Sequence, residues 1–261
     1  MSEVELTGLG RNFFGVGDLA VFGWRAIREA FRRPFEGGEI FRQLYEVGWR
    51  SLPLIAASGF AVGAVMSMHT RSSLERFGAE AMIPTVLALA LVKETGPLVA
   101  GLLLSGRVGA GIGAELGAMR VSEQIDALES LAVDSFKYLV VTRVIACVIA
   151  LPILTTVMNF TGIMGGYLAE TVISGMSFEA YFDGAFASIE FVDYVPATLK
   201  TMVFGFIIGA VSTYLGYNTT GGTAGVGQAS TRSVVMASVL VIMSNVILVK
   251  SIFFIFPGAF E

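Results

Sequence analysis

Five long apolar stretches constrain the fold of this chain more than any other feature of its sequence. A hydrocarbon core about 30 Å thick needs about 20 helical residues, and each stretch is long enough to cross it, although the first is short. Membrane β-strands need only about 10 residues of alternating polarity, and no stretch shows such alternation. We therefore expect an all-α integral membrane protein with five transmembrane helices, at about residues 52–68, 82–105, 138–168, 195–217 and 234–256.

The composition agrees with a membrane location. Of the 261 residues, 54% are hydrophobic and only 15% are charged, whereas a soluble domain carries about 25% charged residues. The mean hydropathy is +0.74. The net charge of −4 argues against nucleic-acid binding. The N-terminus has no basic segment leading into an apolar core, so we expect no cleavable signal peptide.

Lysine and arginine are spread unevenly over the connections between these stretches. The connection 70–81 holds two arginines, and the acidic connection 169–194 holds neither lysine nor arginine. By contrast, four basic residues follow the second stretch (Arg107, Arg120, Lys137 and Arg143), and seven arginines precede the first (Arg11, Arg25, Arg28, Arg32, Arg33, Arg42 and Arg50). The positive-inside bias places the N-terminus in the cytoplasm, and five crossings put the C-terminus outside. The acidic connection is either a solvated loop or includes a short helix.

The segment before the first stretch predicts an amphipathic helix in the cytoplasmic membrane interface. Its arginines lie on a different face from its apolar residues, and Pro34 ends the run. The apolar residues recur at helical spacing and are Leu19, Phe22, Ile27, Ala30 and Phe31. Docking on a soluble neighbour is the alternative. We therefore divide the chain into N-terminal cytoplasmic or interfacial helices, residues 1–50, and a transmembrane domain, residues 51–261.

The connection after the second stretch contains a second, shorter amphipathic helix. Ser122 is a plausible N-cap, and Glu123 follows in the first turn, where the helix dipole favours an acid. Its apolar residues recur at intervals of four, three and four positions, whereas its acidic residues recur at intervals of three positions (Glu123, Asp126 and Glu129). Such a helix either rests its apolar edge on lipid or seats in a groove of a soluble partner.

A stripe of small residues runs along the second stretch and beyond it. Its members recur at every fourth position and are Gly101, Ser105, Gly109, Gly113 and Gly117. Such stripes let helix backbones approach closely. Packing within the chain explains most of them, and a dimer seam would explain one or two.

Known nucleotide-binding and catalytic motifs are missing. No glycine precedes any lysine, which excludes a Walker A loop, and GAGIGA at residues 109–114 lacks the preceding strand of a dinucleotide site. His69 is the only histidine and Cys147 the only cysteine, so a two-histidine zinc site and an intrachain disulfide are excluded. We therefore expect neither an enzyme nor a cofactor bound by this chain, and any ATP would be hydrolysed on another chain.

One long block closely resembles the signature of the MlaE/YrbE permeases, which are membrane subunits of ABC transporters that work with MCE-domain proteins. The block reads KETGPLVAGLLLSGRVGAGIGAELGAMRVSEQIDALESLAVDSFKYLVVTR and begins at Lys93. The resemblance continues through GGYL, KTMVFGFIIG and GYNTTGGTAGVGQASTRSVV, and covers nearly the whole chain after residue 40.

The resemblance implies a homodimeric permease in the bacterial inner membrane. It further implies two ATPase subunits that bind ATP and magnesium on the cytoplasmic side, an MCE-protein ring on the periplasmic side, and a lipid cargo, most often phospholipid. One segment matches the family's coupling helix, which docks on the ATPase: Glu123, Gln124, Ile125, Asp126, Ala127 and Leu128. The family usually has Arg-Glu where this chain has Lys93 and Glu94, so the planar donor fork of arginine is missing here.

Two charges lie in the middle of the second apolar stretch. Lys93 and Glu94 are neighbours that point about 100° apart on a helix, so they cannot easily neutralise each other. Each would cost roughly 2.5–3.5 kcal/mol or more facing lipid at mid-membrane. Pro97 cannot donate a hydrogen bond to the carbonyl of Lys93, and it bends the helix there, while Gly96 adds local freedom.

Two interpretations of these charges stay open. One is a polar spot in an apolar cavity at the dimer centre, beside the path of a lipid headgroup, with a substrate path along Lys93, Glu94, Pro97, Leu98, Met66 and Met68. The other is an internal contact of Glu94: an ion pair with Lys250, the concrete candidate, or with Lys200, or a polar contact with Asn245 or Asn159.

Two other classes of function compete with an ATP-driven lipid permease. An autonomous channel or ion-coupled secondary transporter would use Lys93 and Glu94 as a relay. Such transporters often contain inverted repeats with broken helices in both halves, and the KETGP break has no second copy here. The third class is a structural membrane anchor for a partner.

Overall fold

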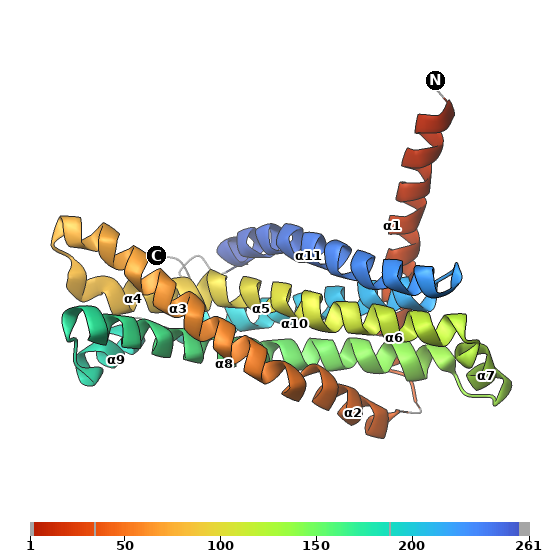
Figure 1. Cartoon of the computed structure of the whole chain (residues 1–261), viewed down its shortest axis with the longest axis horizontal. Coiled ribbons are helices and arrows are strands. Elements are labelled where there is room, and N and C mark those ends of the chain that lie inside the picture. The colour runs from red at the N-terminus through yellow and green to blue at the C-terminus, as the bar shows by residue number, and fades with distance from the viewer. Residues whose placement is uncertain (1–2, 34, 188, 256–261) are drawn as a thin grey trace.

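The computed structural model describes residues 3–33, 35–187 and 189–255, and these residues form helices without any β-strand (Figure 1). The main helices are α1 Glu3–Ala30, α2 Gly37–Val47, α3 Leu52–Leu74, α4 Ile83–Ala90, α5 Gly96–Leu104, α6 Ala110–Val121, α7 Gln124–Ser130, α8 Thr142–Ser174, α9 Phe178–Ala187, α10 Phe191–Tyr217 and α11 Gly222–Ile255. Short 3₁₀ turns are η1 Trp49–Ser51, η2 Glu75–Phe77 and η3 Glu80–Met82, and π-helical turns are η4 Leu91–Thr95, η5 Ser105–Gly109 and η6 Phe136–Val141.

Five helical segments of the described chain are long and apolar enough to cross a membrane, which confirms the predicted all-α fold with five spans. They are Gly37–Phe77, Glu80–Val121, Phe136–Ser174, Phe191–Tyr217 and Gly222–Ile252. They lie roughly side by side in an elongated bundle (Figure 1). One end of the bundle carries α7 and the other carries α9 and the α3–α4 turn, and we call them the α7 end and the α9 end.

The second segment extends further than its apolar stretch predicts. It continues through η5 and α6 to Val121 instead of ending near residue 105. The reason is packing, because the small-residue stripe lies against α10 and α11: Ser105 Oγ is 2.7 Å from Ser238 Oγ, and a Cβ on Gly113 would lie 2.4 Å from Ser233 Oγ. Packing within the chain therefore explains these stripe positions. Phe256, the predicted end of the fifth span, lies outside the described residues, as does Pro34.

Helix α1 runs across the long axis of the bundle near its α7 end (Figure 1). Phe22 packs edge-on against Phe136 at 5.0 Å and Tyr214 at 5.3 Å between ring centroids. Arg25 does not point away from this face, because its guanidinium lies 4.0 Å above the Phe136 ring. Trp24 remains exposed. The helix therefore attaches to the bundle through one face and leaves apolar surface on another, as an interfacial helix would.

At the α9 end a buried ion pair joins α3 to α8. Glu170 is fully buried and accepts hydrogen bonds from Arg71 and, at 2.8 Å, from the hydroxyl of Ser67. The acidic connection after α8 contains the helix α9. Its aromatic side chains Phe178 and Phe182 pack together with 4.3 Å between their ring centroids. The solvated-loop interpretation of this segment is therefore wrong for residues 178–187.

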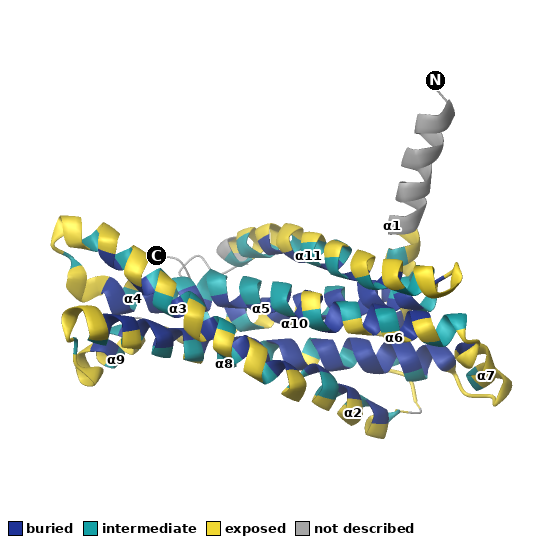
Figure 2. Ribbon diagram, viewed as in Figure 1, coloured by how far each residue is buried: buried dark blue, intermediate teal, exposed yellow. Residues whose placement is uncertain are grey.

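Helix α11 is the least covered of the five spans. Only 17% of its apolar window is buried, against 61% for the third span. Figure 2 shows exposed and half-exposed positions along much of its length. Its exposed apolar side chains include Val235, Val239, Ile242, Met243, Val246, Ile247 and Phe254. This face therefore remains available to lipid or to another protein chain.

Candidate functional site

The second span changes its winding where its two charges lie. Lys93 and Glu94 belong to the π-helical turn η4, and Pro97 lies in the first turn of α5 directly afterwards. Gly96 serves close packing rather than flexibility here, because its φ of −59° is ordinary and a Cβ would lie 1.7 Å from Asn159 Oδ1. The sequence KETGP thus produces a wide turn with a neighbouring helix pressed against it.

Lys200 of α10 binds two polar groups of this π-helical turn. Its ammonium group lies 2.7 Å from Oε2 of Glu94 and donates a hydrogen bond of 2.8 Å to the carbonyl oxygen of Lys93. That carbonyl is the one that Pro97 cannot satisfy, because proline has no N–H to donate. The side chain of Lys200 is only 2% exposed. One buried cation therefore neutralises the carboxylate and satisfies the backbone.

Two further polar side chains extend the cluster. Asn245 of α11 donates a hydrogen bond to the other carboxylate oxygen of Glu94. Lys93 points away from Glu94 and forms an ion pair of 2.8 Å with Asp193 in the first turn of α10. Asp193 is an unexpected member, because hydropathy places this acid in the connection 169–194, outside the membrane. We call Lys93, Glu94, Asp193, Lys200 and Asn245 the polar cluster.

The prediction that Lys250 is the ion-pair partner of Glu94 is wrong, whereas the alternative contacts of Glu94 with Lys200 and Asn245 are confirmed. Lys250 is exposed on α11 and lines an open cavity of about 460 Å³ together with Glu94, Asn245, Val246 and Val249. The Glu94 side chain remains 42% exposed in this cavity. A carboxylate and an ammonium group thus line a cavity whose remaining wall includes valine side chains, which suits a ligand with both charged and apolar parts.

The other residues of the predicted substrate path do not join the polar cluster. Pro97 is buried within the helix bundle, and Leu98 packs on the main apolar core. Met66 packs on a separate apolar cluster that contains Leu87 and Tyr181. Met68 is 52% exposed on the outside of α3. Of the predicted substrate path, only Lys93 and Glu94 therefore belong to the polar cluster, and Pro97 lies in the adjoining turn.

The predicted amphipathic helix after the second span is α7. Ile125 is fully buried in the main core and Leu128 packs against that core, so its apolar edge lies on the protein itself rather than on lipid. Glu123, Gln124, Asp126 and Ala127 are exposed, although Asp126 forms an ion pair of 2.7 Å with Arg120.

The start of α7 differs from the predicted cap. The Ser122 hydroxyl donates to the carbonyl of Ala118 at 2.7 Å, so Ser122 terminates α6 instead of capping α7. Glu123 occupies the N-cap position with φ of 60°, a left-handed conformation that is uncommon for a non-glycine residue. The cause is the extra length of α6, which leaves only Ser122 and Glu123 to turn the chain into α7.

Helix α7 is linked to α10 by side-chain hydrogen bonds. Glu129 accepts from the hydroxyl groups of Tyr217, at 3.2 Å, and Ser135, at 2.6 Å. Tyr217 is the last residue of α10, and Lys200 lies 17 residues earlier on the same helix, about 26 Å away at 1.5 Å per residue. A single helix therefore connects α7 with the polar cluster.

Five apolar helices long enough to cross a membrane, three of which hold a polar cluster that borders an open cavity, are typical of a membrane transport subunit. Comparison with known proteins agrees: the family model described as Permease MlaE matches residues 40–250, and the chain belongs to this family of ABC transporter permeases. ATP hydrolysis in such systems lies on a separate chain.

Several relatives match over most of this chain. A probable ABC transporter permease protein of Rickettsia felis is 41% identical over 238 residues, which cover 91% of this chain and 92% of the relative. The intermembrane phospholipid transport system permease protein MlaE of Haemophilus influenzae is 31% identical over 82% of each chain. The chloroplastic protein trigalactosyldiacylglycerol 1 of Arabidopsis thaliana is 36% identical over 84% of this chain and 61% of its own length.

Proposed function

We propose that this chain is the permease of an ATP-driven transporter that moves lipid, most simply phospholipid, between the inner membrane and a periplasmic MCE-domain partner. The observation that carries the proposal is the polar cluster, whose half-exposed Glu94 lines the open cavity beside α11. Ionisable groups at membrane depth usually mark a substrate or ion path. The phospholipid system of the Haemophilus relative supports this class of cargo.

A second copy of the chain would close the cavity. The exposed apolar residues of α11 flank it, and large exposed apolar patches beside polar groups mark interaction surfaces. A homodimer that meets along α11 would turn two open cavities into one enclosed space. Glu94 and Lys250 of each copy would then face the headgroup of the cargo, and the valines would face its acyl chains.

ATP-driven movement would enter through α7. In the proposed orientation the α7 end is cytoplasmic and the α9 end periplasmic, in agreement with the basic residues near the α7 end. The exposed face of α7, around Gln124 and Ala127, would dock on the ATPase. Ile125 and Glu129 tie this helix to the bundle, and α10 would carry the displacement to Lys200 and therefore to Glu94.

The proposal is tested by replacing the carboxylate that faces the cavity. Glu94→Gln keeps the side-chain size and removes the charge, and Glu179→Gln on the exposed surface of α9 is the matched control. In a reconstituted complex we expect Glu94→Gln to lower ATP-dependent phospholipid transfer by about tenfold, the effect of ~1.4 kcal/mol on the transport barrier. Transfer by the control should be unchanged. Equal transfer rates for both variants would remove Glu94 from the mechanism.

The rival function, an autonomous channel or ion-coupled carrier, is separated by ion flux. Liposomes that contain the chain without an ATPase should show no conductance and no proton-driven uptake. Flux that disappears in Glu94→Gln would favour the relay function of Lys93 and Glu94 instead.

A further inference from the structure

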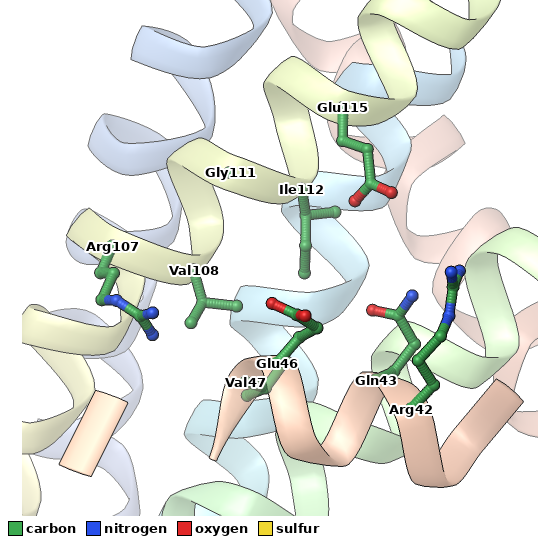
Figure 3. Close-up of a pocket in the computed structure, with 9 residues that line it drawn as sticks. All are labelled: Arg42, Gln43, Glu46, Val47, Arg107, Val108, Gly111, Ile112 and Glu115. Atoms are coloured by element: carbon green, nitrogen blue, oxygen red, sulfur yellow. The ribbon is translucent and has the colours of Figure 1, made fainter. Parts of the chain in front are cut away.

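A second polar cavity lies at the α7 end of the bundle, between α2 and the helix formed by η5 and α6. Its volume is about 370 Å³, within the range of about 300–1,000 Å³ that is typical of small-molecule sites. Figure 3 shows Arg42, Gln43 and Glu46 of α2 rising toward the opposite wall, which carries Arg107 and Glu115. None of these five residues belongs to the polar cluster around Glu94.

Arg107 places a guanidinium group in this cavity, and most of its N–H donors remain available to a ligand. Its guanidinium donates one hydrogen bond to the hydroxyl of Ser51, and that hydroxyl in turn donates to the carbonyl of Val47 at 2.5 Å. Arg107 forms no ion pair with the residues that the structure describes. A guanidinium has five N–H donors in a planar fork that matches phosphate oxygens. The side chain is therefore held in place by Ser51 and still able to bind an anion.

The cavity also offers carboxylates. The side chains of Glu46 and Glu115 are 41% and 51% exposed, and each already has one arginine partner, Arg50 at 2.7 Å and Arg143 at 2.8 Å. A half-exposed carboxylate has up to four acceptor sites, so one arginine leaves room for an ammonium group. Two arginines and two glutamates line the cavity, so side chains of both charge signs face a ligand in it. This lining favours a ligand that carries both signs over an anion or a cation alone.

The surroundings place this cavity at the level of lipid headgroups. The outer face of α2 exposes Phe41 and Tyr45, and Trp49 follows them, whereas the apolar run of α3 begins at Leu52 directly afterwards. Exposed aromatic side chains at the start of an apolar span mark the boundary between headgroups and acyl chains. The cavity itself combines its charges with apolar wall residues such as Val108.

We infer that this cavity binds the headgroup of a zwitterionic phospholipid from the cytoplasmic leaflet. The phosphate lies on Arg107, and the ammonium group lies between Glu46 and Glu115. The assignment to the cytoplasmic leaflet rests on the orientation given under the proposed function, whereas the chemistry of the site does not. The chain would therefore contain two lipid sites, one beside Glu94 and one at the α7 end of the bundle.

The test uses a fluorescent reporter inside the cavity of the full-length chain. Gly111 lines the cavity, and a Cβ at this position meets no atom within 4 Å, so Gly111→Cys can carry a bimane label. The native Cys147 is fully buried and should not react. The labelled protein is titrated with dihexanoyl-phosphatidylethanolamine, dihexanoyl-phosphatidylglycerol and inorganic phosphate, the lipids below their critical micelle concentrations.

We expect the ethanolamine lipid to bind most tightly. Arg107→Gln should weaken its binding by about tenfold, equivalent to ~1.4 kcal/mol, whereas Arg76→Gln, an exposed arginine at the α9 end, should leave it unchanged. Equal binding by these two variants would overturn the site. Inorganic phosphate binding as tightly as the lipid would show a free-anion site and would overturn the lipid assignment.

A second variant protects the test against misfolding of Arg107→Gln. Glu46 is half-exposed, and Glu46→Gln should fold normally and lose most of the preference for ethanolamine over glycerol headgroups. An unchanged preference would overturn the zwitterion assignment. Transport by Glu94→Gln is a separate readout, so this cavity can fail the test while the proposed function stands.

Discussion

The ammonium group of Lys200 lies 2.7 Å from the carboxylate of Glu94, at the level where the second span changes to a π-helical turn. The two residues come from different spans and are 106 positions apart. Lys200 is nearly inaccessible, whereas Glu94 keeps contact with the open cavity. This asymmetry predicts unequal effects when each partner is removed.

Glu94→Ala should destabilise the fold more than Lys200→Met. The first substitution leaves a buried ammonium group with only a carbonyl partner, and hydrogen bonds to charged groups contribute about 1.5–3 kcal/mol. The second leaves a half-exposed carboxylate that still accepts from Asn245 and can be solvated. Thermal unfolding of both variants in the same detergent measures the difference. An equal or larger loss for Lys200→Met would contradict the assigned burial.

The buried pair of Arg71 and Glu170 gives a sharper test of the α9 end. Arg71→Met leaves the fully buried Glu170 uncompensated, and breaking such a pair costs about 3–5 kcal/mol. Adding Glu170→Met should restore most of the lost stability, because the double variant buries no charge. Glu80→Gln is the control, since Glu80 is half-exposed and 3.6 Å from Arg71. A double variant no more stable than Arg71→Met would argue against the pair.

Close packing of α3 against α8 should make Gly63 intolerant of substitution. A Cβ at this position would lie 1.8 Å from the carbonyl oxygen of Gly162, so Gly63→Ala must push the two helices apart. Overpacking typically costs about 1–3 kcal/mol. At Gly227, in an exposed part of α11, a Cβ meets no atom within 4 Å, and alanine there should stabilise the helix by up to ~1 kcal/mol. Melting temperatures that move in the same direction would refute this packing.

The bond between Tyr217 and Glu129 should matter for coupling more than for folding. Tyr217→Phe removes the hydroxyl that joins α10 to Glu129 of α7 and also bonds Ser135, a loss of about 1 kcal/mol for each hydrogen bond. We expect ATP hydrolysis by the complex to continue while lipid transferred per ATP falls severalfold. Tyr194→Phe is the matched control, because Tyr194 bonds Thr156 near the other end of α10. Unchanged transfer per ATP in Tyr217→Phe would exclude α10 as the connection.

Much of the fold follows from the sequence, because the apolar stretches are long and the small-residue stripe has the period of a helix. The residues at which the spans end cannot be predicted from the sequence in the same way. Arg107 and a run of glycines after residue 105 suggest a connection, yet α10 packs on Gly109, α11 packs on Gly113, and the helix continues to Val121. Tertiary packing, which hydropathy does not record, decides that boundary.

The candidate site was only partly predictable. Pro97 indicates that the carbonyl of Lys93 needs another donor, and burial indicates that Glu94 needs a cation. Which lysine supplies both depends on the rotation of α10 and α11 about their axes, so Lys200 and Lys250 look equivalent in the sequence. Glu123 as the N-cap of α7 depends in the same way on where α6 ends.

The account depends most directly on ATP-dependent lipid movement through this chain. The decisive measurement is transfer of a fluorescent phospholipid in liposomes that contain the purified chain, with and without its ATPase and ATP. We predict transfer only when the chain, the ATPase and ATP are all present, and loss of both transfer and ATPase binding in Ala127→Arg on the exposed face of α7. Transfer or ion conductance by the chain alone, undiminished in that variant, would contradict the account.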